Sequence, residues 1–225
     1  MTRNQPRSLA ATAMLLALAA CSPPDSRTDM NAVISSTADQ GGAPASARNP
    51  APKEAYRITM TFKDAPGSFA WMKALAQYDV VNKECLSPPK DNPGGRTAPV
   101  PTDDVEIPLQ KISETEYVGT VYADQMLDQD YAGRGVCHWK LIQFRVHMKA
   151  TGAHEETLFI PSIPDDKLLS ASTERVFFNK ISYSHRDSQY EPIDTGESDR
   201  SKFGPSIKDT DLFTVTFASE KEATP

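Results

Sequence analysis

The sequence has no excess of basic residues, which excludes one large class of partners. Its 225 residues contain 24 Lys and Arg against 30 Asp and Glu, giving a formal net charge of −6. Nucleic-acid binding draws on counterion release by clustered basic side chains, so we expect no nucleic-acid partner. An acidic surface either favours a basic protein partner or only keeps the chain soluble, and composition leaves both open.

Recognisable catalytic and metal-binding motifs are also missing. The chain contains neither a G-x-S-x-G nucleophile elbow nor a Gly-rich phosphate loop. His154 and Glu155 begin like a zinc-protease helix, but Leu158 stands where the second histidine should be. The four histidines show no other metal-ligand spacing, and His147 alternates with polar residues as a solvent-facing strand residue would. We therefore expect no enzyme activity, no cofactor and no metal site.

The N-terminal apolar run is too short to cross a bilayer. It covers residues 9–20, roughly 12 residues where a spanning helix needs about 20. Arg3 and Arg7 precede it and small residues end it, which is typical of a secretory signal segment, here residues 1–20. Removing that segment takes away two of the 24 basic residues and no acidic one, so 22 against 30 leaves a net charge of −8.

The run ends in Leu18-Ala19-Ala20-Cys21, which resembles the cleavage box of bacterial lipoproteins. The resemblance implies that the Cys21 thiol is acylated and becomes the first residue of the mature protein. The protein would then be held in the periplasm by its acyl chains. Ser22 resembles a signal for the outer membrane, because lipoproteins kept on the inner membrane often carry Asp at that position.

Only two further cysteines are present, Cys85 and Cys137. In an oxidising compartment this pair predicts a single disulfide, and closing a loop of roughly 50 residues contributes about 4 kcal/mol through chain entropy. A metal site would need more ligands at fixed spacing than one distant pair offers.

Composition divides the mature chain into a tether and one domain. Residues 22–54 are poor in apolar side chains and hold no aromatic residue, which predicts that residues 21–54 form a flexible tether behind the lipid. About 170 residues follow, the size of one domain. We place the domain at residues 55–220 and a disordered tail at residues 221–225.

The domain alternates apolar and polar residues with the period of β-strands. The alternation is clearest at residues 56–62 and 213–217. Residues 68–78 fit either one face of a short helix or a strand, and we favour the strand. Shorter strand candidates, separated by proline- and glycine-rich loops, are residues 105–109, 117–122, 158–160 and 176–183. The predicted fold class is all-β, a disulfide-closed sandwich of mostly antiparallel strands.

The longest strand candidate, residues 136–149, changes phase along its length. Trp139 and Leu141 share one parity, whereas Ile142 and Phe144 share the other. An extra residue where the two sets meet would turn both toward the core, so the pattern predicts a β-bulge there. Trp139 would then lie beside the disulfide.

The loop before this strand has two interpretations. Residues 128–133 open like a calcium-binding loop, but Ala132 and Trp139 stand where oxygen ligands are required. The segment is either a turn or a recognition loop with an apolar centre and a charged rim, and it can be both. The residues expected to contact a partner are Met126, Asp128, Asp130, Tyr131 and Arg134. Residues 185–211 form a second long polar segment, expected to be functional or disordered.

Several motifs together resemble a group of bacterial lipoproteins. They are residues 117–124 (YVGTVYAD), 128–131 (DQDY), 133–139 (GRGVCHW), 159–161 (FIP) and 212–215 (LFTV). Such lipoproteins are similar to immunity proteins found beside type VI secreted phospholipase effectors. The resemblance implies a periplasmic protein that binds and neutralises a secreted effector, with a phospholipase as the expected partner. Two alternatives stay open: a structural or assembly lipoprotein of the cell envelope, and a lipoprotein that binds a small ligand or metal.

Overall fold

The computed structural model describes residues 46–86, 99–183 and 190–223. The predicted signal segment and Cys21 lie outside the described residues. Among the described residues, no helix is long and apolar enough to cross a membrane.

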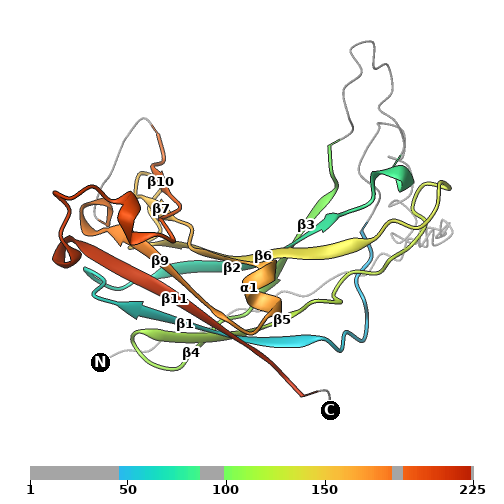
Figure 1. Cartoon of the computed structure of the whole chain (residues 1–225), viewed down its shortest axis with the longest axis horizontal. Coiled ribbons are helices and arrows are strands. Elements are labelled where there is room, and N and C mark those ends of the chain that lie inside the picture. The colour runs from blue at the N-terminus through green and yellow to red at the C-terminus, as the bar shows by residue number, and fades with distance from the viewer. Residues whose placement is uncertain (1–45, 87–98, 184–189, 224–225) are drawn as a thin grey trace, which may run out of the picture. The chain divides into compact units, whose positions relative to one another are not determined.

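Two β-sheets make up the domain, and the predicted all-β sandwich is confirmed (Figure 1). The first sheet has the strand order β4 (Gln110–Lys111), β5 (Glu116–Tyr122), β1 (Ala55–Lys63), β11 (Leu212–Lys221) and β9 (Thr173–Asn179). The second has the order β10 (Ile193–Asp194), β7 (Leu158–Phe159), β6 (Trp139–Lys149), β2 (Trp71–Val80) and β3 (Thr102–Ile107), with β8 (Ser162–Pro164) also beside β6. Every pairing is antiparallel except that of β10 with β7.

Most predicted strands are present, and residues 71–80 form a strand, as favoured. The sequence patterns did not indicate the short helices. These are α1 (Asp165–Leu169), η1 (Lys83–Cys85), η2 (Lys180–Ser182), η3 (Arg200–Lys202) and η4 (Asp209–Asp211). None is longer than five residues, so none spans enough turns to show helical periodicity.

Alternate residues of the long strands fill the space between the sheets. Ile58 and Met60 from β1 are buried, as are Phe144 from β6 and Phe217 from β11. The rings of Phe144 and Phe217 meet edge to face across the two sheets, with centroids 5.8 Å apart. Because inward residues recur at every second position, a period-two pattern on both sheets produces one continuous core.

The predicted β-bulge is confirmed in β6. Gln143 is opposite Gln77 of β2, but the next pair is Leu141 with Tyr78, so Ile142 is the extra residue. The bulge lets both Leu141 and Phe144 point inward, and both are fully buried. It also turns Trp139 toward a second cluster formed around the disulfide.

The ordered domain begins earlier than residue 55, which corrects the predicted extent of the tether. The Asp124 carboxylate accepts hydrogen bonds from the backbone N–H groups of Lys53 and Glu54, at 2.9 and 3.0 Å. Asn49 N–H donates to the Gln125 carbonyl at 2.7 Å. Residues 46–54 therefore form an ordered strap along the domain. Its contacts are polar and non-local, which is why composition did not reveal it.

The described part of the polar segment 185–211 is also ordered. β10 pairs with β7, and the backbones of Glu197 and Phe177 exchange two hydrogen bonds of 3.0 and 2.8 Å. Gly196 has a φ of +69°, and a Cβ there would lie 2.4 Å from Val176. Glycine therefore allows this segment to pack closely against β9 despite its few apolar residues.

Candidate binding surface at the disulfide

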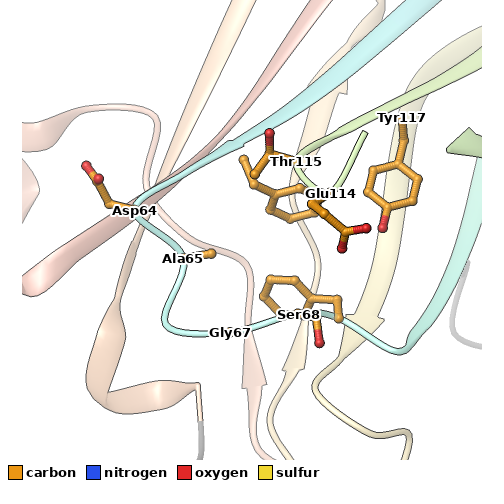
Figure 2. Close-up of a pocket in the computed structure, with 9 residues that line it drawn as sticks. Asp64, Ala65, Gly67, Ser68, Glu114, Thr115 and Tyr117 are labelled. Carbon is orange, nitrogen blue, oxygen red and sulfur yellow. The ribbon is translucent and has the colours of Figure 1, made fainter. Parts of the chain in front are cut away.

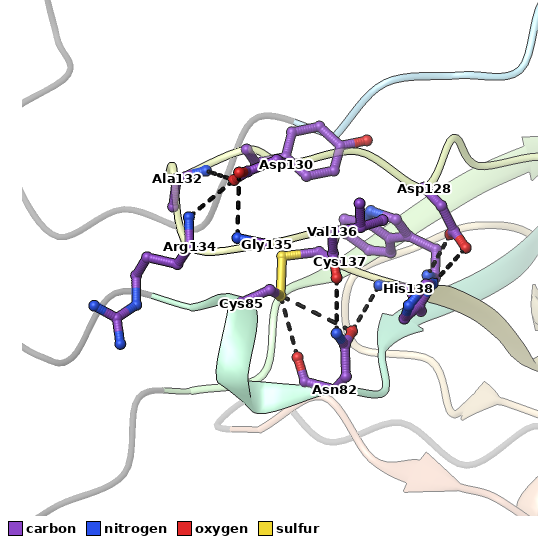
Figure 3. Close-up of a disulfide and its surroundings, with 12 residues drawn as sticks. Asn82, Cys85, Asp128, Asp130, Ala132, Arg134, Gly135, Val136, Cys137 and His138 are labelled. Atoms are coloured by element: carbon purple, nitrogen blue, oxygen red, sulfur yellow. Dashed lines mark hydrogen bonds and ion pairs between the residues drawn. A yellow bond between two sulfur atoms is a disulfide. The ribbon is translucent and has the colours of Figure 1, made fainter.

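The predicted disulfide joins Cys85 to Cys137, with Cα atoms 5.2 Å apart (Figure 3). Cys85 ends η1, which follows β2, and Cys137 lies just before β6. Both residues are buried, and Trp139 packs against the cluster that they form. The bond fixes one end of the segment that we call the disulfide-end loop, residues 127–138.

Asn82 extends the pairing of β2 and β6 with its side chain. Its Nδ2 donates to the Val136 carbonyl at 2.8 Å, and its Oδ1 accepts from the backbone N–H of His138 at 2.6 Å (Figure 3). The backbone of Val81 adds a third bond, N–H to the His138 carbonyl, at 2.9 Å. One amide side chain thus fixes the end of the loop beside the disulfide.

Asp128 holds the start of the loop against its end. One carboxylate oxygen lies 2.7 Å from His138 Nδ1, and the other accepts from the backbone N–H of Trp139 at 2.9 Å. The Asp128 and His138 side chains are 46% and 55% exposed, so this pair is a surface interaction that the geometry of the loop brings together.

Asp130 forms the turn at the tip of the loop. Its carboxylate accepts from the backbone N–H groups of Ala132, Arg134 and Gly135, at 3.2, 3.1 and 3.2 Å. Gly135 has a φ of +106°, which an L side chain would rarely adopt. The turn interpretation is confirmed, and both aspartates direct their oxygens at their own chain.

In residues 46–86, 99–183 and 190–223, no three His, Cys, Asp or Glu side chains gather as metal ligands.

Met126 and Tyr131 connect the loop to the domain. Met126 is buried in the main core, and Tyr131 packs against the disulfide cluster. The Tyr131 hydroxyl donates to the Leu127 carbonyl at 2.6 Å and accepts from the backbone N–H of Ala47 at 3.3 Å. The strap therefore contacts the loop directly.

Two apolar side chains and one cation are among the groups exposed around this rigid frame. Val81 is 54% exposed and Val136 is 45% exposed, and Arg134 is exposed as well. Figure 3 shows the Arg134 side chain extending away from the loop. No ion-pair partner of Arg134 is found in the part of the chain that the structure describes. We call Val81, Arg134 and Val136 the disulfide-end surface.

The five residues predicted to contact a partner have different positions. Arg134 is presented to solvent, Asp128 and Asp130 shape the loop, and Met126 and Tyr131 pack beneath it. Sequence reasoning did not single out Val81, Asn82 or Val136 as functional. The available signal was Val136 next to Cys137 and Val81 four positions before Cys85, because a disulfide brings nearby residues together.

Lowering the pH until the Asp130 carboxylate is protonated is expected to loosen the tip of the loop. The pKa of Asp130 lies below its ordinary value of 3.8, mainly because the Gly135 N–H donates to the charged carboxylate, with smaller help from Arg134 and Ala132. A carboxyl group whose pKa is lower in the folded protein than in the unfolded chain stabilises the fold at pH values above its unfolded-state pKa. That stabilisation is lost as the pH falls through its folded-state pKa.

Hydrogen-exchange protection factors at the amides of Ala132, Arg134 and Gly135 measure this effect. Protection should fall as the pH drops below the ordinary value of 3.8, and D130N should show low protection that does not change with pH. Wild-type protection that persists to about pH 2 would show that the carboxylate does not hold the turn.

Comparison with known proteins gives no family assignment: no protein-family model, curated protein or solved structure matches this chain.

Proposed function

We propose that this protein is a lipid-anchored periplasmic binding protein that neutralises a secreted antibacterial effector, with a phospholipase as the expected partner. One observation of the structure carries the binding role: an internally hydrogen-bonded loop, fixed at one end by the disulfide, lies beside two exposed valines and the exposed Arg134. The lipid anchor, the compartment and the type of effector rest on the sequence resemblances.

The rigidity of the loop favours binding. Association of two proteins loses free energy when flexible loops become ordered at the interface. Here the Asp130 carboxylate and the Asn82 amide hold the loop in one conformation before any partner arrives. Arginine is also one of the residue types enriched at binding hot spots.

The strap supports the placement of this surface near a membrane. Leu127 N–H donates to the Ala47 carbonyl at 2.9 Å, so the chain enters the domain beside the disulfide-end loop. Only residues 22–45 separate this strap from Cys21. An acylated Cys21 would keep the surface close to the membrane that a phospholipase attacks, and a higher local concentration strengthens binding without additional contacts.

A rescue assay tests the proposed function. The product of the gene next to this one is directed to the periplasm of a sensitive host, and lysis is followed with and without this protein. We expect the wild-type chain to prevent lysis and R134E to fail, whereas R57E, the same charge reversal on an exposed position of β1, should protect fully. Lysis that wild-type protein does not relieve would contradict the proposal for that pair and favour a role in envelope assembly.

A further inference from the structure

A second candidate site lies at the other end of β2 from the disulfide. A cavity of about 300 Å³ opens between residues 62–69, which run from the end of β1 toward β2, and residues 114–117, which lead into β5. β2 runs ten residues from Trp71 to Val80, so roughly 30 Å of strand separates this cavity from the disulfide-end surface. The two sites are therefore physically independent.

Three aromatic side chains form much of the cavity wall. Phe62 and Phe69 stack with ring centroids 5.2 Å apart, and Tyr117 meets Phe62 edge to face at 5.9 Å. Both phenylalanines are buried, and Tyr117 is half-buried. Aromatic rings attract cations through the negative charge of their faces, most strongly when the cation is partly removed from water.

The charged residues of the lining are both acidic. They are Glu114 and Asp64, and no Lys, Arg or His is among the lining residues. Figure 2 shows the Glu114 carboxylate on the same side as the Tyr117 hydroxyl, whereas Asp64 stands at the opposite rim with its carboxylate turned outward. Lys111 lies 2.8 Å from Glu114, but the two side chains are 48% and 85% exposed, so this ion pair is weak enough for a ligand to replace.

The Tyr117 hydroxyl adds an oxygen to the lining. Within the described ranges no hydrogen bond to this hydroxyl is found, and its charged neighbour is Lys111, the cation that pairs with Glu114. An ammonium group in the cavity could donate to the Tyr117 oxygen and to Glu114 while its carbon chain contacts Phe62 and Phe69.

Contacts between neighbouring segments fix the wall of the cavity. Phe62 N–H donates to the Thr115 carbonyl at 2.8 Å, which joins the two lining segments. On the other side, the Tyr183 hydroxyl donates to the Ser68 carbonyl, and a Cβ at Gly67 would lie 2.5 Å from that hydroxyl. A larger residue than glycine would displace Tyr183, so this close approach fixes the shape of the wall.

A neighbouring cavity of about 470 Å³ does not share the purely acidic lining of the first cavity. Its lining pairs Lys63 and Arg175 with Asp64 and Asp209, so its formal charges cancel. That cavity favours no one class of ligand.

We infer that the cavity lined by Phe62, Phe69, Glu114 and Tyr117 binds a small organic ammonium ion. The site recognises charge and an attached apolar group together, which a free amine or the lysine side chain of another protein both supply. This inference does not depend on the proposed inhibition of an effector.

NMR titration of the mature protein with n-butylammonium tests the inference, with 1-butanol as the uncharged analogue. We expect saturable shifts at the amides of Gly67, Ser68 and Thr115, and binding of the ammonium at least about tenfold tighter than of the alcohol. E114Q should weaken ammonium binding by about threefold, whereas E220Q, the same change at an exposed position of β11, should leave it unaltered.

The same titrations show which results would overturn the inference and which source supplies the ammonium group. Equal affinity for the ammonium and the alcohol would overturn the inference and show only an apolar cavity, as would the absence of saturable shifts with either probe. If the ammonium binds, Nα-acetyl-lysine amide distinguishes the source: affinity similar to that of butylammonium indicates a lysine side chain, and much weaker affinity indicates a free amine.

Discussion

Replacing Cys85 and Cys137 together by alanine is expected to lower the free energy of unfolding by about 4 kcal/mol. The two cysteines are 52 positions apart, so the bond removes much of the conformational freedom of the unfolded chain. Urea unfolding measures the effect, and the slope m should rise because the uncrosslinked unfolded state exposes more surface.

Reduction of the wild-type protein provides the control for this prediction. Its unfolding midpoint should approach that of the double variant, since both lack the cross-link. A double variant as stable as the oxidised wild type would show that the bond does not restrict the unfolded state as argued. In that case the rigidity of the disulfide-end loop would have to come from Asn82, Asp128 and Asp130 alone.

Replacing Phe213 by alanine is expected to cost about 3–5 kcal/mol of unfolding free energy. Phe213 is 1% exposed, and its ring lies 5.1 Å from that of Phe178 and 5.6 Å from that of Phe159. Truncation would leave a cavity between the two sheets that these rigid rings cannot fill. The measurement is the shift in the urea midpoint at constant m.

Two other substitutions serve as controls for the loss of stability in F213A. F213L keeps most of the volume and should cost about 1 kcal/mol. I181A removes a side chain that is 79% exposed, so it should change stability by less than about 0.5 kcal/mol. If F213A costs no more than I181A, the aromatic cluster is not the stabilising core described above.

The sequence alone was enough to predict the β-bulge and the disulfide. The parity change between Leu141 and Ile142 located the bulge, because a strand has only two faces. Two cysteines besides Cys21, in an expected oxidising compartment, predicted a single disulfide, and Cys85 and Cys137 form it.

Features made by distant polar contacts were not predictable in this way. The order of residues 46–54 depends on Asp124, about 70 positions later, and nothing near Lys53 indicates that partner. Likewise, Asp128 and Asp130 looked like groups available to a ligand, whereas the structure directs them at nearby backbone N–H groups, those of Trp139 and Arg134 among them. A carboxylate in a sequence shows its charge but not the group that it faces.

The disulfide-end surface also depends on tertiary structure. Val81 and Val136 are 55 positions apart, and hydrogen bonds of Val81 to His138 and of Asn82 to Val136 join their two segments beside the disulfide. Arg134 was predicted as a contact residue from the composition of its loop. Its exposure is visible in the structure, but its role in binding stays a prediction.

The most direct test of the account is the affinity of the purified mature protein for its purified effector. We expect a complex of nanomolar affinity, which R134E and V136S should each weaken by at least about thirtyfold, with R57E as the matched control. Wild-type affinity in both variants, with intact fold, would contradict the assignment of the disulfide-end surface as the site of binding.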